Sequence, residues 1–173
     1  MTIGIEAVIV SIHVSAAKGA PLVALEVAEL VQGCGIVGDK RFSKSTKDRS
    51  QVTLIEEEAL LAAMAAAELS IDSGASRRNL VTRGVALNHL VGKRFVVGGA
   101  TLEGIELCEP CGHLARCTTA KFSKALVHRG GLRCKIVHSG QCRVGDAVGD
   151  AVGDAVGDAV GDAVGDAVGD DPS

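Results

Sequence analysis

The chain has 173 residues with 18 Lys and Arg against 21 Asp and Glu, which gives a formal net charge of −3. Its aromatic residues are three phenylalanines, and this excludes the aromatic platforms on which proteins stack single-stranded nucleic acid. No stretch approaches the roughly 18–20 consecutive apolar residues of a membrane-spanning helix. We therefore expect neither nucleic acid nor a membrane among its partners.

The net charge conceals two unlike parts of the chain. From Val144 the sequence repeats VGDA in six full copies, and this segment holds eight of the 21 acids and no Lys or Arg. Residues 1–143 therefore carry 18 basic and 13 acidic side chains, a balance of +5. A modest, scattered excess of this kind favours a pocket for a phosphorylated small molecule over a duplex-binding face. We expect one domain over residues 1–146 and a repeat tail over 147–173, for which disorder is the default expectation.

The first half of the body has mainly strand patterns. Residues 5–13 are rich in β-branched side chains and end at a Lys-Gly-Ala-Pro turn, and 23–31 fits a second strand or a short helix. The loop 33–41 contains three glycines within six residues, so its backbone can approach a ligand closely. A short apolar run over 51–55 precedes a helix pattern over 56–69, whose acids lie in the first turn.

Strand patterns return after this helix. Residues 80–82 form a short apolar run, and 94–97 and 101–107 make a hairpin around a Gly-Gly turn. A short helix fits 121–128, and a last strand fits 132–137. Many short strands with glycine turns and one or two short helices predict a mainly β protein, either a closed β-barrel or a β-sandwich, since closure removes exposed edges.

Cys108 and Cys111 are the most informative pair of residues, because two thiols three residues apart point to chemistry in a chain without a secretion signal. No targeting signal is readable at the N-terminus, and six cysteines in such a chain predict reduced thiols and a cytoplasmic location. Three roles are open on spacing alone: a structural zinc site, disulfide cycling, or a thiolate presented to a soft cofactor metal.

Five segments together carry a resemblance to a known family. They are GIVGDKRF (35–42), VTLIEEE (52–58), the run from RRNLVT to CEPCGHL (77–114), HRGGLRCKIV (128–137) and a final VGD (144–146). In this order they resemble the MOSC domain, named after the C-terminal part of molybdenum cofactor sulfurases. The resemblance covers residues 5–146 and implies a β-barrel with a cleft for a molybdopterin-type molybdenum cofactor.

The resemblance assigns the working role to one cysteine. Cys111 matches the position of the family's cofactor-facing cysteine, which ligates molybdenum in reductase-type members. In sulfurase-type members the domain is thought to receive sulfur from a separate pyridoxal-phosphate cysteine desulfurase and to pass it on. The implied partners are thus a cofactor or small-molecule ligand, and a desulfurase or a molybdoenzyme. A thiolate is also the natural protein ligand for a soft metal centre.

Further residues are expected to contact the cofactor by the same resemblance, because its phosphate and pterin need convergent hydrogen-bond donors. They are Arg77, Arg78, Asn79, Lys40 and Arg83. Asp39, Arg41 and Arg49 lie in matching loops.

Other functions remain open from the sequence. Cys108, Cys111, His113 and Cys117, with Cys134, offer zinc ligands, so a zinc-stabilised, non-catalytic interaction module is the main alternative. A molybdenum-dependent reductase of N-hydroxylated compounds is another. Thioredoxin-like cycling is disfavoured, because such a motif begins a helix and the Pro-Cys-Gly sequence at 110–112 does not have a helix-start pattern. The VGDA tail is interpreted as a functionally neutral tandem expansion of the VGD motif.

Overall fold

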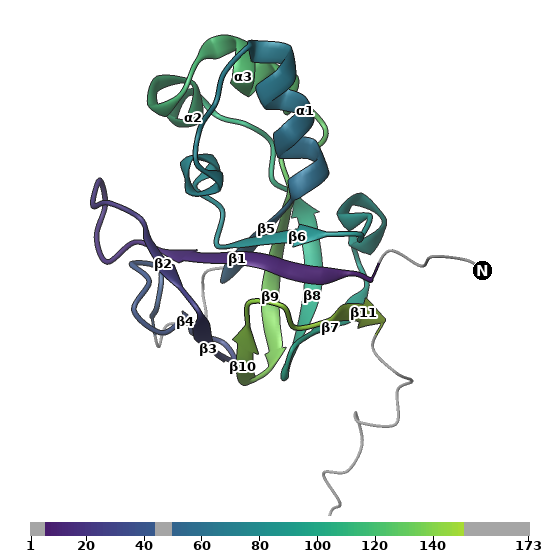
Figure 1. Ribbon diagram of the computed structural model, residues 1–173. Coiled ribbons are helices and arrows are strands. Elements are labelled where there is room, and N and C mark those ends of the chain that lie inside the picture. Colours follow the sequence, from purple (N-terminus) through teal and green to yellow (C-terminus); the bar gives the residue numbers. More distant parts are fainter. Residues whose placement is uncertain (1–5, 44–49, 151–173) are drawn as a thin grey trace, which may run out of the picture.

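The computed structural model describes residues 6–43 and 50–150, which form two β-sheets and three α-helices. The helices gather at one end of the molecule, above the strands (Figure 1). The strands are β1 (Val8–Val14), β2 (Val23–Leu25), β3 (Val27–Val31), β4 (Gly35–Ile36), β5 (Val52–Glu56), β6 (Leu80–Arg83), β7 (Arg94–Val97), β8 (Ala100–Leu107), β9 (Leu132–His138), β10 (Gly140–Arg143) and β11 (Val148–Asp150). The helices are α1 (Glu57–Ala67), α2 (Gly112–Cys117) and α3 (Ala120–Ala125), with 3-10 turns at Ser73–Ser76 and Leu87–Leu90.

The larger sheet has eight strands in the order β11-β7-β8-β9-β5-β6-β1-β2, and the smaller has the order β10-β3-β4. All strand pairs are antiparallel except β5 and β6, which are joined by a crossover through α1. The predicted hairpin is confirmed, because Val97 of β7 lies opposite Ala100 of β8 across the Gly-Gly turn. The mainly β prediction is also confirmed.

The predicted closure into a barrel is not found among the described residues. The strand order leaves β2 and β11 as the two edges of the larger sheet. An isolated bridge between Val8 and Ala147 links the start of β1 to the segment before β11. Three backbone hydrogen bonds accompany this bridge, from Ile9 to Asp146, from Gly145 to Ile9 and from Val148 to Ala7. The contact does not extend into a ladder between β1 and β11, which is three residues long.

Two apolar clusters hold these elements together. The larger lies between the strands and consists of aliphatic side chains around the fully buried Phe95. The smaller joins the helices to the back of β5 and β6 through residues such as Leu60, Leu114, Phe122 and Leu126. A chain with three aromatic residues therefore builds its core from aliphatic side chains and places two phenylalanines at the cluster centres.

The expectation of one or two short helices is wrong for the described residues, because α2 is present where no helix start was expected. Cys111 is the N-cap, in an extended conformation, and Gly112 is the first helical residue. Leu114 in this helix is buried in the smaller cluster, next to α3 and α1. Burial of this side chain explains why a helix forms over a sequence with weak local preference.

The first AVGD copy of the repeat is part of the fold, since Val148–Asp150 form β11. The rest of the predicted tail and Arg49 lie outside the described residues. Within the part of the chain that the structure describes, no helix is long and apolar enough to cross a membrane.

Candidate functional site

A cleft with a volume of about 130 Å³ lies where several strand ends and loops meet. One water molecule needs roughly 10–15 Å³ of such space, so the cleft has room for on the order of ten waters. It is lined by Ser15, Leu22, Asp39, Lys40, Arg41, Thr53, Arg77, Arg78, Asn79, Cys108, Glu109, Cys111, His113 and Arg133. Five of these residues are Lys or Arg and two are carboxylates, so the cleft has a positive balance.

The structure brings together most of the residues singled out from the sequence. Cys111, Arg77, Arg78, Asn79 and Lys40 all line the cleft, although they come from three separate segments of the chain. The three segments converge because β6 begins directly after Asn79, the part of the glycine loop that carries Lys40 follows β4, and the cysteine segment follows β8.

Arg83 is not among the lining residues. It ends β6, and its Nε lies 2.7 Å from Oε2 of Glu57 at the start of α1. Its side chain is 50% exposed, so the contact is a surface ion pair. The resemblance predicted a cofactor contact for this residue, but its position at the end of β6 lies away from the cleft.

Cys111 is an exposed thiol at the N-terminus of α2. Its pKa lies below the ordinary value, chiefly because the backbone N–H of Leu114 stabilises the thiolate. The N–H of His113 and the charges of Arg78 and Arg116 act in the same direction, while partial desolvation opposes them. The helix start thus favours the nucleophilic, metal-binding form of this residue.

Three of the other five thiols are buried, unlike that of Cys111. Cys108 is buried, and burial raises the pKa of Cys134 strongly and that of Cys142 to about 11. Cys117 is exposed, and its sulfur lies 3.5 Å from Nε2 of His113. The two thiols of the Cys-x-x-Cys segment are therefore not equivalent.

The ligands proposed for zinc do not gather into one site. Residues 6–43 and 50–150 contain no group of three or more His, Cys, Asp or Glu side chains placed to hold a metal ion. Cys134 lies within β9, buried in the larger apolar cluster, while Cys117 is exposed at the end of α2.

Arg78 holds the backbone of the segment that carries Cys108 and Cys111 through hydrogen bonds. Its buried guanidinium donates to the carbonyl oxygens of Gly130 at 2.9 Å, Cys108 at 3.2 Å and Ser76 at 3.2 Å. Burial lowers its pKa, and the nearby thiols of Cys108 and Cys111 oppose that shift. Three of its five N–H groups are thus bound to carbonyl oxygens, and its charge is held close enough to Cys111 to act on that thiol.

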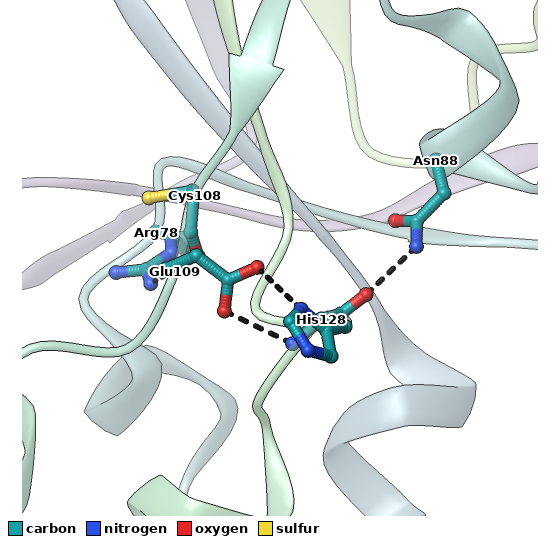
Figure 2. Close-up of polar contacts among 5 residues, drawn as sticks. All are labelled: Arg78, Asn88, Cys108, Glu109 and His128. Carbon is teal, nitrogen blue, oxygen red and sulfur yellow. Dashed lines mark hydrogen bonds and ion pairs between the residues drawn. The ribbon is translucent and has the colours of Figure 1, made fainter.

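Glu109 holds the same segment through contacts with His128. Figure 2 shows its carboxylate directed at His128, whose backbone N–H lies 3.0 Å from Oε2 and whose Nδ1 lies 3.2 Å from Oε1. Asn88 donates to the carbonyl oxygen of His128 at 2.7 Å. The backbone N–H of His128 is the main reason that the pKa of Glu109 lies below its ordinary value. His128, the first residue of the HRGGLRCKIV segment, thus acts on the cleft through Glu109.

Gly130 brings the two loops into backbone contact. A Cβ at this position would collide with the carbonyl oxygen of Cys108, so a side chain does not fit. The N–H of Cys108 also donates to Gly131 at 2.7 Å. Glycine is therefore required where these two loops touch at the edge of the cleft, because a side chain would force them apart.

The side-chain amide of Asn79 is fully engaged in hydrogen bonds within the fold. Its Oδ1 accepts from the N–H and the hydroxyl of Thr53, both at 3.1 Å. Its Nδ2 donates to the carbonyl oxygen of His13 at 3.1 Å and to Oδ2 of Asp39 at 3.3 Å. Both amide hydrogens and both carbonyl lone pairs are engaged, so the side chain joins β1, β5 and the glycine loop.

Asp39 in turn organises the loop that carries Lys40 and Arg41. Its carboxylate accepts from the backbone N–H of Ser15 at 3.1 Å and of Arg41 at 3.0 Å, in addition to Asn79. Lys40, Arg41 and Arg77 form no ion pair with any residue that the structure describes. These three side chains are the uncommitted positive charges of the cleft, meaning that no carboxylate among the described residues neutralises them.

Several lining residues were not singled out from the sequence. Glu109 and Arg133 lie inside the CEPC and HRGGLRCKIV motifs, and membership of these motifs is the sequence signal that points to them. Arg133 has a distant partner, Glu106, at 3.8 Å. Ser15 and Leu22 lie in the loop after β1, and nothing in their sequence context indicates a site.

Comparisons with known proteins agree with this architecture. The crystal structure of the YUAD protein from Bacillus subtilis superposes with a TM-score of 0.70 at 16% identity, over 82% of this chain and 94% of that one. YiiM from Geobacillus stearothermophilus gives 0.63 at 16% identity, over 83% and 74%. YiiM from Escherichia coli gives 0.61 at 16% identity, over 82% and 68%. At such identities the likeness shows a shared fold.

The sequence comparison is more specific. A search of curated proteins found no match. The family model of the MOSC domain matches residues 41–149, which is more than half of the chain and includes the cleft residues from Arg41 to Arg133. The chain therefore belongs to the MOSC domain family.

Proposed function

We propose that the cleft binds a molybdopterin-type molybdenum cofactor and that Cys111 is its metal ligand or carries sulfur. The observation that supports this most directly is the combination of one exposed thiol of lowered pKa with uncommitted cations in the same cleft. A thiolate is the ligand type that a soft metal prefers. The cations match the anionic phosphate of such a cofactor.

The side chains that line the cleft are of the chemical types that would bind a molybdopterin-type cofactor. Lys40, Arg41 and Arg77 would hold the phosphate by charge, since none of them has an ion-pair partner in the described part of the chain. When bound, the cofactor would supply a soft molybdenum centre. Cys111 would present its thiolate to that centre, with Arg78 stabilising the negative charge.

The residues also fit sulfur carriage. The Cys111 thiolate can attack the outer sulfur of a persulfide on a pyridoxal-phosphate cysteine desulfurase. The sulfur–sulfur bond of the donor breaks, the donor leaves as a thiolate, and Cys111 becomes a persulfide. This step is balanced without an external oxidant or reductant, and it needs an exposed, deprotonated thiol.

The test compares Cys111→Ser with Cys117→Ser, since both thiols are exposed on the same short helix. Each protein is purified from a host that makes the cofactor, and molybdenum, pterin fluorescence and persulfide mass are measured. We expect Cys111→Ser to lose most of the bound molybdenum or the persulfide, and Cys117→Ser to retain both. Loss of molybdenum assigns ligation, and loss of the persulfide alone assigns sulfur carriage. Unchanged loading in Cys111→Ser would overturn the proposal.

A further inference from the structure

Strand β11 is built from a sequence that occurs again in the same chain. Residues 147–150 read AVGD, and five identical copies follow at 151–154, 155–158, 159–162, 163–166 and 167–170. The cleft does not use this segment. The function proposed above therefore gives no account of the repeat.

One side chain anchors β11 to the fold. Val148 lies opposite Val97 of β7 and is 4% exposed, as part of the larger apolar cluster. Gly149 and Asp150, opposite Val96 and Phe95, are exposed. The strand is thus held by one buried valine in four residues.

The remaining contacts of the segment are made by the backbone. Ala147 accepts from the N–H of Gly98 at 3.1 Å on the β7 side. On the β1 side, Val148 donates to Ala7 at 2.8 Å and Asp146 accepts from Ile9 at 2.9 Å. Backbone contacts do not depend on which copy of a repeat makes them.

The repeat length preserves this arrangement. Side chains alternate between the two faces of a strand, so a shift of four residues returns each side chain to the same face. It also places a valine again at the buried position. A shift of two would bring an aspartate there, and burial of an unpaired carboxylate is strongly unfavourable. A shift of one or three would turn the valine to the other face and leave glycine or alanine at the buried position. Shifts by whole copies are the ones that keep a valine buried there.

We propose that the later AVGD copies are interchangeable with residues 147–150, so that any of them can supply β11 within the same chain. A shift by one copy adds four residues to the connection between β10 and β11. The entropy of closing a loop grows slowly with its length, so this insertion costs little. The chain then carries spare copies of the strand at the edge of its larger sheet.

The test uses two full-length backgrounds of equal charge. In one the tail is natural, and in the other the five later valines, at 152, 156, 160, 164 and 168, are replaced by serine. Val148→Asp is introduced into each, and the thermal midpoint is measured. With the serine tail we expect the midpoint to fall by roughly 10 °C, as for a buried charge in a domain of this size. With the natural tail most of that loss is recovered.

Two further measurements make the outcome decisive. Hydrogen exchange at the Gly98 N–H, which bonds to Ala147, should stay slow in Val148→Asp with the natural tail and become fast with the serine tail. Light scattering should show monomers in both. If Val148→Asp with the serine tail does not fold, Val148→Ala gives a graded version of the same comparison. Equal losses in the two backgrounds would overturn the proposal, and so would recovery that occurs only in a dimer, because the strand would then come from a second copy.

Discussion

Asn79 is a buried residue of the cleft lining, here called the floor, and Lys40 is an exposed one, here called the rim. Both were expected to contact a cofactor, but the structure shows that only Lys40 keeps its polar group free of partners among the described residues. The amide of Asn79 is buried and its hydrogen-bonding groups are all used by His13, Thr53 and Asp39. The ammonium of Lys40 is exposed and has no ion-pair partner among the described residues.

The difference separates residues that shape the cleft from residues that can act on a ligand. Floor residues are engaged before any ligand arrives, and replacing one of them changes stability. Rim residues keep their charges available, and replacing one of them changes binding. Arg78 has properties of both groups, because three of its N–H groups bind carbonyl oxygens while its charge acts on Cys111. Predictions that separate stability from binding test this division.

The largest effect is expected for Asn79→Asp. The substitution keeps the shape, removes both donors, and places a second carboxylate beside Asp39, whose Oδ2 lies 3.3 Å from Nδ2 in the structure. We expect a loss of about 3–5 kcal/mol in the free energy of unfolding at neutral pH, measured in urea.

The pH dependence of this variant has a definite sign. The neighbouring carboxylate of Asp39 and burial raise the pKa of the new acid in the folded state above its unfolded value of about 3.9. The penalty is therefore smallest in acid and grows as the pH rises above that unfolded pKa. A penalty that does not change between pH 4 and pH 7 would contradict the assignment of Asn79 to the floor.

An intermediate effect, on binding alone, is expected for Lys40→Gln combined with Arg41→Gln. Titration with inorganic phosphate should show affinity reduced by roughly tenfold, which corresponds to about 1.4 kcal/mol. The free energy of unfolding should change by less than about 0.5 kcal/mol, because neither side chain has an ion-pair partner in the described part of the chain. A large loss of stability with unchanged phosphate affinity would place these residues with the floor.

The smallest effect is expected for Arg83→Gln, the matched control outside the cleft. It removes an exposed ion pair with Glu57, a kind of contact that contributes about 0–1 kcal/mol. Phosphate affinity should be unchanged within error. Weakened phosphate binding in this variant would show that the resemblance placed Arg83 correctly and that the cleft extends beyond the lining described above.

Much of the fold was predictable from local sequence patterns. β-Branched residues predicted a strand near β1, a short apolar run predicted β5, and the Gly-Gly dipeptide predicted the hairpin of β7 and β8 correctly. Helix α2 was missed because its start depends on the burial of Leu114 against α3, which local preference does not encode. The barrel closure was not found because β11 is short, and its contact with β1 is one bridge with a few backbone hydrogen bonds and no ladder.

For the candidate cleft, the sequence predicted several of the lining residues but not the contacts that each of them makes. Motif matching brought Lys40, Arg78 and Cys111 to one cleft. It did not show that Asn79 has no free donor, because its partners His13 and Thr53 lie 66 and 26 residues away in sequence. It also could not show how Cys108 and Cys111 differ in burial and in the helix start beside them.

The close contact between Gly130 and Cys108 has a consequence for binding. Because the two loops touch through their backbones, and because Arg78 and Glu109 hold the same segment, the thiol of Cys111 is attached to a segment that is ordered before a ligand enters. Ordering a loop on binding normally subtracts from affinity. That entropy is already lost during folding here, so contacts to the sulfur can contribute to affinity in full.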